Sequence, residues 1–257
     1  MTHSDAVWIY KGHATVNLQS TITMLLYHKL LLVLLLSGGH QMTGIEHGSK
    51  VPDGVMQYMV SVQNNKGHVC GGFLVSDDFV LTAAHCDQLT KVILGNHNLD
   101  VGNTTKIKKQ IKHESFKEWM SGNDLMLLEL EKKAENIRKA TLPTVNMKVK
   151  AHDLCQVAGW GRTSEHSGPV VNLMAANVSI IDITNCKKNC SILPDNVTCA
   201  KGCTNIKFYQ DDFGGPLVCN NTTVGLLSFN KFEQQIFPNV FVDISKYLLW
   251  INEKIAS

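Results

Sequence analysis

Leu81-Thr82-Ala83-Ala84-His85-Cys86 places a histidine and a cysteine directly after an apolar run that has the length of a strand. Two further stretches also set a polar residue beside an apolar run. Asn123-Asp124-Leu125-Met126-Leu127-Leu128 contains an acid before the run, and Asp212-Phe213-Gly214-Gly215-Pro216-Leu217-Val218-Cys219 joins an acid to a glycine pair and a cysteine. Each stretch has an ordinary structural explanation when it is taken singly. Their order along the chain limits which folds fit the sequence.

Short apolar runs separated by turn residues follow one another from residue 55 onward, at intervals of roughly ten residues. They occupy residues 58–62, 72–75, 79–81, 91–94, 125–128, 155–158, 176–181, 217–219 and 224–227. This rhythm is typical of an all-β sandwich or barrel. Near the end, apolar residues recur instead at helical spacing, at Ile244, Tyr247, Leu248 and Ile251. With Asp243 or Ser245 as N-cap, they predict a C-terminal α-helix over residues 243–254.

The N-terminal region has the features of a secretory leader. Lys29 precedes the apolar residues 30–36, and small residues follow. So short a run cannot span a bilayer as a helix, and no later segment is apolar enough to do so. We expect a signal peptide at residues 24–40 and a secreted chain that is extracellular or stored in secretory granules, with no membrane partner once the signal is removed. Residues 1–23 are a doubtful extension, either a longer leader or an artefact of an upstream start codon.

Composition and charge limit the number of domains and the kinds of partner to be expected. The chain has 257 residues, 44% of them hydrophobic, which suits one domain of moderate size or two small fused ones. A formal net charge of +2 gives no reason to expect a nucleic-acid partner. The basic run 106–113 alternates charge with Ile107 and Ile111, which predicts the solvated face of a strand; a polyanion-binding patch is the alternative.

Secretion permits disulfides, and the chain has eight cysteines: Cys70, Cys86, Cys155, Cys186, Cys190, Cys199, Cys203 and Cys219. No pair has the Cys-x-x-Cys spacing of a zinc site, so they predict a disulfide framework, and we expect neither a metal nor a cofactor. Several Asn-x-Ser/Thr sequons predict some glycosylation of a secreted chain; they start at Asn103, Asn177, Asn189, Asn196, Asn220 and Asn221.

In order and spacing, the three opening stretches resemble the chymotrypsin-like serine proteases (the trypsin-type, S1 family), whose triad runs His, Asp, Ser along the chain. Val157-Ala158-Gly159-Trp160-Gly161 and the closing helix match the same family, over about residues 45 to 252. The resemblance implies two antiparallel six-stranded β-barrels, at about residues 45–145 and 146–242. The stretches 67–74 and 228–230 look most like the granzyme, mast-cell protease and duodenase group, and a cysteine pair of many trypsins is missing.

The same resemblance implies a set of disulfides: Cys70 with Cys86, Cys155 with Cys219, and Cys186 with Cys199. Cys190 and Cys203 are left over, because the family cysteine that precedes the nucleophile by two residues is Tyr209 here. These two cysteines pair with each other, remain free or link two chains.

By resemblance, His85 matches the general base and Asp124 the acid that orients it. Phe213 falls on the nucleophile, and a phenyl ring has no lone pair with which to attack. Asp211 replaces a glycine whose N–H, with that of residue 213, forms the oxyanion hole. We expect the Asp211 side chain to strain the backbone there and its charge to oppose a developing anion. The expected result is a protease homologue without activity.

Family members are made as zymogens, which here implies an activation peptide at residues 41–44 and insertion of the Ile45 amine beside Asp212. Glu46 replaces an apolar residue that is usually buried, which disfavours this insertion. The positions that match substrate-binding residues are Lys207, at the floor of the specificity pocket, Ser228, Phe229 and Asn230. A lysine at the floor would disfavour basic side chains.

Three functions remain open. The one we favour is a secreted homologue without protease activity that binds protein or peptide ligands in the former substrate cleft, with protease inhibitors or granule polyanions as further partners. The second is an active granzyme-like serine endopeptidase, if Phe213 and Asp211 are sequence errors, each one base change from the family residue. The third is a decaying duplicate with no selected role, suggested by the joint departure of Glu46, Tyr209 and Asp211.

Overall fold

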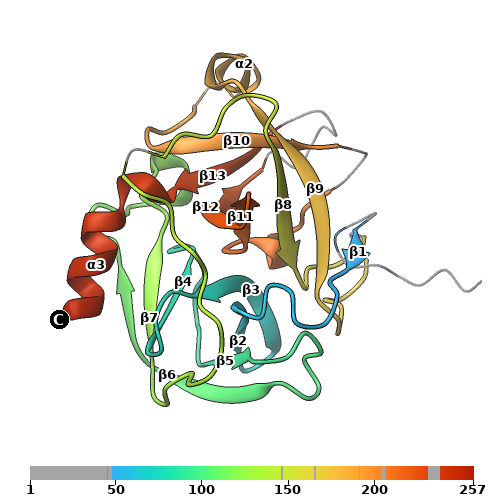
Figure 1. Cartoon of the computed structure of the whole chain (residues 1–257), viewed down its shortest axis with the longest axis vertical. Helices are drawn as coiled ribbons and strands as arrows, with labels where there is room; N and C mark the ends of the chain where they lie inside the picture. Colours follow the sequence, from blue (N-terminus) through green and yellow to red (C-terminus); the bar gives the residue numbers. More distant parts are fainter. Residues whose placement is uncertain are drawn as a thin grey trace, which may run out of the picture. The chain divides into compact units, whose positions relative to one another are not determined.

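The computed structural model describes residues 45, 48–145, 147–164, 166–190, 192–203, 207–230 and 238–257. The expected signal peptide, the expected activation peptide and Glu46 lie outside the described residues, so these three inferences stay predictions. β-Strands are the main regular secondary structure of the described chain, and they are arranged around two centres (Figure 1).

Six strands of the N-terminal half close into an antiparallel barrel (Figure 1). They are β2 Met59–Asn64, β3 Gly67–Leu74, β4 Phe79–Thr82, β5 Lys91–Leu94, β6 Asn103–Lys112 and β7 Met126–Leu130. Their order is β2-β3-β4-β7-β6-β5, and the pairing of Ser61 with Ile93 belongs to the β2–β5 ladder that completes the ring. Residues of the predicted apolar runs, such as Val60 and Leu128, are fully buried. The basic run lies in β6, which is mostly exposed, so its interpretation as a solvated strand is confirmed.

The C-terminal half forms a second six-stranded barrel. Its strands are β8 Leu154–Gly159, β9 Met174–Ile181, β10 Val197–Gly202, β11 Pro216–Cys219, β12 Thr222–Phe229 and β13 Asn239–Asp243. The order β9-β10-β13-β12-β11-β8 closes because β8 also pairs with β9. The prediction of an all-β protein made of two antiparallel six-stranded barrels is confirmed.

Among the described residues, helices are few and short. They comprise α2 Ile183–Asn189, α3 Leu248–Ala256 and the 3₁₀ turns η1 Trp119–Ser121, η2 Gln210–Asp212 and η3 Ile244–Lys246. The C-terminal helix was predicted to begin at residue 243. Asp243 does act as a cap, since its carboxylate accepts from the Ser245 N–H, but it caps the 3₁₀ turn η3. The α-helix begins only at Leu248, after Tyr247.

Each end of the described chain contacts the barrel that is formed by the other half of the chain. Strand β1, Ser49–Lys50, pairs with β9, so it belongs to the second barrel although the first was expected to begin at residue 45. Helix α3 follows the second barrel but contacts the first. Glu114, just after β6, accepts from the Trp250 indole at 2.6 Å and pairs with the Lys254 ammonium at 2.6 Å.

The three disulfides implied by the resemblance are present. Cys70 is bonded to Cys86, Cys155 to Cys219 and Cys186 to Cys199. The remaining two cysteines, Cys190 and Cys203, are free thiols, so the alternative in which they pair with each other within the chain is not realised.

The barrels meet at a turn that fixes the position of residue 213. The Phe213 carbonyl accepts from the Gly71 N–H of β3 at 2.8 Å, and the Gly214 N–H donates to Leu227 of β12 at 2.7 Å. Gly214 has a φ of +80°, and a Cβ there would collide with the Gly71 carbonyl and the Thr82 hydroxyl. Only glycine therefore lets this turn come so close to the first barrel.

Candidate active site

His85 and Asp124 come together because β4 and β7 are neighbouring antiparallel strands. Thr82, at the end of β4, pairs with Met126, at the start of β7, so the residues just beyond these ends share one edge of the barrel. The His85 Nδ1 atom lies 2.7 Å from Asp124 Oδ2, and the His85 backbone N–H donates to Oδ1 at 2.9 Å. Asp124 is fully buried, whereas the His85 side chain keeps 21% of its surface exposed.

The contacts of Asp124 fix the tautomer of His85. A buried carboxylate accepts hydrogen bonds, so the Nδ1 atom that faces it carries a proton and Nε2 is left as the basic nitrogen. The Ser228 hydroxyl donates to the same carboxylate at 2.5 Å. Asp124 thus accepts from His85 twice and from Ser228, and these bonds offset the cost of burying its charge.

The side chain of Phe213 packs on the imidazole of His85. The two ring centroids are 5.3 Å apart and the ring planes meet at 78°. Phe213 is 7% exposed and belongs to the hydrophobic core. The residue that the resemblance aligns with the nucleophile therefore offers carbon and hydrogen, not a hydroxyl, to the base.

The turn before Phe213 differs from the strained backbone expected at Asp211. Asp211 lies in the 3₁₀ turn η2 and does not have a positive φ. The Phe213 N–H donates to the Gln210 carbonyl at 3.2 Å, inside this turn. The expectation of strain is wrong because the turn adopts a conformation that any residue tolerates.

The Asp211 carboxylate is paired with Arg162, a contact that was not predicted. Arg162 Nε donates to Oδ2 at 2.8 Å and Nη2 donates to Oδ1 at 3.2 Å. Hydrogen bonding to Asp211 raises the pKa of Arg162 further above its usual range. The charge expected to oppose an anion is thus compensated by a guanidinium. The arginine follows the Gly159-Trp160-Gly161 stretch, but nothing in the sequence marks it as the partner of a residue so far along the chain.

The Asp211 carbonyl is held from the first barrel by His68, which was also missed. His68 Nε2 donates to this carbonyl at 2.9 Å, and its Nδ1 lies 2.8 Å from the Ser61 hydroxyl. Burial lowers the pKa of His68 to about 4, against a smaller opposing effect of the Asp211 carbonyl. The ring is therefore neutral near pH 7, with its proton on Nε2, and Ser61 donates to Nδ1.

Asp212, the expected partner of the Ile45 amine, is fully buried. Its carboxylate accepts from the backbone N–H groups of Gly161 and Tyr209, both at 3.0 Å. Burial raises the pKa of Asp212 to about 7, although these two bonds act in the opposite direction. Ile45 is itself fully buried. The residues around Ile45 are not described, so insertion of its amine stays a prediction.

A cavity of about 550 Å³ runs past the dyad. His85, Asp211, Phe213 and the predicted substrate-binding residues Ser228, Phe229 and Asn230 all line it. Trp119, which was not predicted, lines it too and meets the Phe229 ring at a centroid distance of 5.1 Å. Lys207 is half-buried and is not among the lining residues. Since residues 204–206 are not described, the role of Lys207 at the pocket floor stays a prediction.

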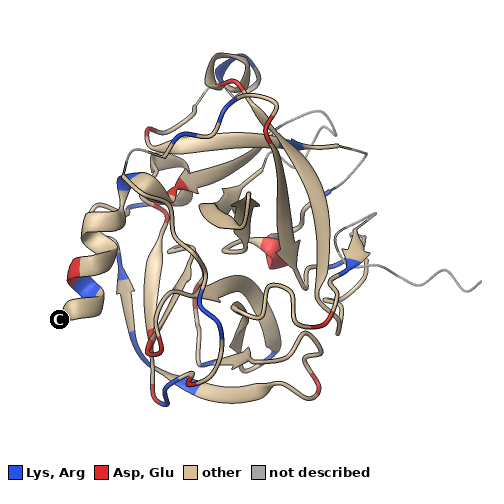
Figure 2. Cartoon of the chain, viewed as in Figure 1, with Lys and Arg blue, Asp and Glu red and all other residues tan. Residues whose placement is uncertain are grey.

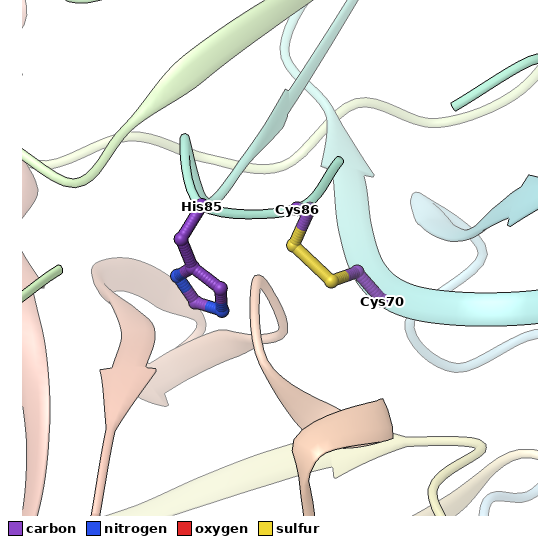
Figure 3. A group of neighbouring side chains, drawn as sticks. All are labelled: Cys70, His85 and Cys86. Carbon is purple, nitrogen blue, oxygen red and sulfur yellow. A yellow bond between two sulfur atoms is a disulfide. The ribbon is translucent and has the colours of Figure 1, made fainter. Parts of the chain in front are cut away.

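His85 also lies beside the Cys70–Cys86 disulfide, which joins its loop to β3 (Figure 3). These three side chains bring potential metal-ligand atoms within 4.8 Å of one another. Metals bind thiolates, and both sulfur atoms here are bonded to each other. The disulfide therefore anchors the His85 loop covalently to β3.

A His–Asp dyad at the junction of two six-stranded antiparallel barrels defines the chymotrypsin-like serine proteases as a structural class. The protein-family model described as Trypsin matches residues 45–251 of this chain. The chain therefore belongs to the trypsin family of serine proteases.

Several of its relatives are granzymes, duodenases and mast-cell proteases. The chain is 38% identical to granzyme F of Mus musculus, over 87% of this chain and 96% of the relative. It is 34% identical to duodenase-1 of Bos taurus, over 87% and 94% of the two chains. A solved structure of GrC superposes with a TM-score of 0.76 at 30% identity, covering 83% of this chain and all of the other.

Basic and acidic residues are interspersed along both barrels and α3 (Figure 2). Two lysines of β6 have acidic partners, since Lys108 pairs with Glu129 and Lys112 with Asp87. Within the described ranges, none of the helices has the length and apolar character that a membrane span needs.

Proposed function

We propose that this chain is a secreted trypsin-family homologue that does not cleave peptides and acts by binding proteins or peptides in its cleft. The observation that carries the proposal is the packing of the Phe213 ring against His85. The dyad of His85 and Asp124 supplies a base, but the side chain that meets it has no proton to lose. Loss of the nucleophile costs on the order of a millionfold in the turnover of a serine protease.

The cleft itself remains suited to ligands. A cavity of about 550 Å³ falls within the usual size of ligand sites, and its wall combines rings with polar groups. Trp119 is 40% exposed and packs edge-on against Phe229, so it offers an apolar contact surface to a bound side chain. Protein inhibitors of serine proteases, which occupy substrate clefts, are the partner class that we propose first.

The Asp211–Arg162 pair makes a folded, inactive homologue feasible, because the guanidinium compensates the charge of the Asp211 carboxylate. Whether Asp211 and Phe213 are the encoded residues is a separate question. An independent transcript read across residues 205–219 tests this step. Glycine at 211 with serine at 213 would instead support an active endopeptidase.

A fluorophosphonate probe tests the absence of activity. The chain, expressed from its full coding sequence and cleaved after Gly44, is incubated with the probe beside its Phe213→Ser/Asp211→Gly variant. We expect no labelling of the chain itself, and specific labelling of the chain would overturn the proposal. Binding of an immobilised Kunitz-type inhibitor by the unlabelled chain would support the binding role.

Secretion and glycosylation belong to the same proposal. Asn103, Asn177, Asn196, Asn220 and Asn221 are exposed sequon positions in the folded domain. Asn220 and Asn221 form the tip of the β11–β12 hairpin and are one acceptor, since adjacent sequons are rarely both occupied. Mass spectrometry of the chain from culture medium tests this, together with the predicted removal of residues before Ile45. Retention of the chain inside the cells would contradict it.

A further inference from the structure

We infer that the ion pair between Arg162 and Asp211 locks the turn Gln210–Asp212 in a closed form, in which neither Asp211 nor Phe213 offers its N–H to an oxyanion. Arg162 is thus a positioning residue, which acts on the cleft through Asp211. This conformation of the turn does not depend on whether the cleft binds a peptide.

The hydrogen bond inside the turn removes both donors at once. The Phe213 N–H is engaged by the Gln210 carbonyl at 3.2 Å. That carbonyl and the Asp211 N–H belong to one planar trans peptide, in which the C=O and N–H bonds point in opposite directions. A carbonyl directed toward Phe213 therefore directs the Asp211 N–H away from it. Rotating this peptide plane is the only way to present both donors to the same ligand atom.

The residue type at 211 opposes that rotation. Turning the peptide through half a circle changes φ of Asp211 by a similar angle, from its present negative value toward the positive region. Glycine visits positive φ freely, whereas a residue with a Cβ is disfavoured there by steric contact with its own backbone. Aspartate at this position therefore favours the closed turn even before its carboxylate is considered.

Arg162 adds a second constraint. Its two nitrogen atoms contact both carboxylate oxygens, a fork geometry that fixes the orientation of the side chain as well as its distance. The Asp211 side chain is only 10% exposed, so water competes weakly for the pair. Moving Asp211 to open the turn would pull its carboxylate away from the guanidinium.

His68 completes the lock from the other barrel. It donates to the Asp211 carbonyl at 2.9 Å and is itself held by Ser61, which in turn accepts from the Gln63 amide at 3.1 Å. Residue 211 is therefore held at its side chain by the second barrel and at its carbonyl by the first. The rigid turn then forms one wall of the cleft.

Amide hydrogen exchange at Phe213, measured by NMR on the full secreted chain, tests the lock. Arg162→Gln and Asp211→Asn each break the ion pair, and we expect each to speed exchange of this amide by about tenfold to a hundredfold. The double variant should exchange no faster than the faster single variant, because both changes remove one interaction. Arg162→Lys keeps the charge without the fork and should fall between. Lys139→Gln, which breaks the Lys139–Asp77 pair elsewhere, is the control and should leave the amide unchanged.

Two results would overturn the inference. One is unchanged exchange at Phe213 in Arg162→Gln, and the other is effects of the two single variants that multiply in the double variant. If Arg162→Gln fails to fold because it leaves a buried carboxylate unpaired, the double variant, which carries neutral amides at both positions, still gives the answer. In that case its Phe213 amide must exchange faster than that of the unmodified chain.

Discussion

The Phe213 ring meets the imidazole of His85 edge to face, with centroids 5.3 Å apart. Aromatic pairs in this geometry contribute about 0.5–1.5 kcal/mol beyond the burial of their surface. The contact also keeps His85 in place beside Asp124 without a serine to bond. The base and its orienting acid thus keep their arrangement through packing against Phe213.

Restoring the hydroxyl alone should not restore proteolysis. In Phe213→Ser the Asp211 carboxylate still holds the turn closed through Arg162, whereas Phe213→Ser/Asp211→Gly removes this constraint. A missing oxyanion donor costs about a hundredfold to a thousandfold, so we expect the double variant to react with a fluorophosphonate at least about a hundredfold faster. Equal rates of acylation for the two variants would show that Asp211 does not impair the site.

The stability of the uncleaved chain should depend on pH through Asp212. Its pKa is about 7 in the folded chain against about 3.9 when unfolded, so the folded state binds more protons between these values. Folding stability from this group is therefore present at low pH and is lost as the pH rises from about 4 to 7. Urea unfolding at pH 4.5, 6 and 8 should show the chain losing roughly 3–4 kcal/mol relative to Asp212→Asn across this window.

The comparison with Asp212→Asn isolates this effect, because both proteins keep His68, whose lowered pKa has the opposite influence. A difference in unfolding free energy that stays constant over the three pH values would contradict the burial of a protonated Asp212.

Trp119 should matter for binding in the cleft. Its ring is exposed on one side and supported by Phe229 on the other, so Trp119→Ala removes an apolar contact surface without opening the core. We expect this variant to weaken binding of a Kunitz-type inhibitor by about tenfold, the typical loss for an aromatic contact of more than 1 kcal/mol. Surface plasmon resonance measures the change. Leu249→Ala, at an exposed position of α3, should bind like the unmodified chain.

The disulfides should differ in their contributions to stability. Cys155–Cys219 closes a loop with a sequence separation of 64 residues, and Cys186–Cys199 one of 13. The chain-entropy relation assigns about 4 kcal/mol to the longer loop and about 3 kcal/mol to the shorter. Paired Cys→Ser variants, compared by urea unfolding, should show the larger loss for Cys155/Cys219. The reverse order would mean that strain or unfolded-state structure outweighs loop length.

The sequence predicted most of the fold because its signals are local. Apolar runs and turn residues located the majority of the strands, and the resemblance supplied their closure into barrels and the disulfides. Strand β1 was not predicted, since two residues carry no periodicity and their pairing with β9 is set by tertiary contacts. The start of α3 was placed early because Asp243 caps a 3₁₀ turn with the same local chemistry that caps an α-helix.

Site residues could be predicted where the local sequence around a residue indicates its role. Contacts between residues that are far apart along the chain could not be predicted. The histidine and the aspartate of the dyad were identified, and the structure brings them together. The contact of Asp211 with Arg162 and that with His68 join segments that are remote along the chain, so no local pattern reveals them. The effect of aspartate on the turn was misjudged for the same reason, because its backbone relaxes into a 3₁₀ turn that these partners hold.

The contact of each chain end with the other half's barrel has a consequence for synthesis. Strand β1 leaves the ribosome long before its partner β9, and the first barrel receives its contacts with α3 only when residues 248–256 emerge. The first barrel therefore lacks part of its cover until helix α3 has been made. A chain that stops short of Leu248 would therefore expose the surface around Glu114 on a barrel whose strands are all present, which is the kind of half-finished domain that chaperones and proteases recognise.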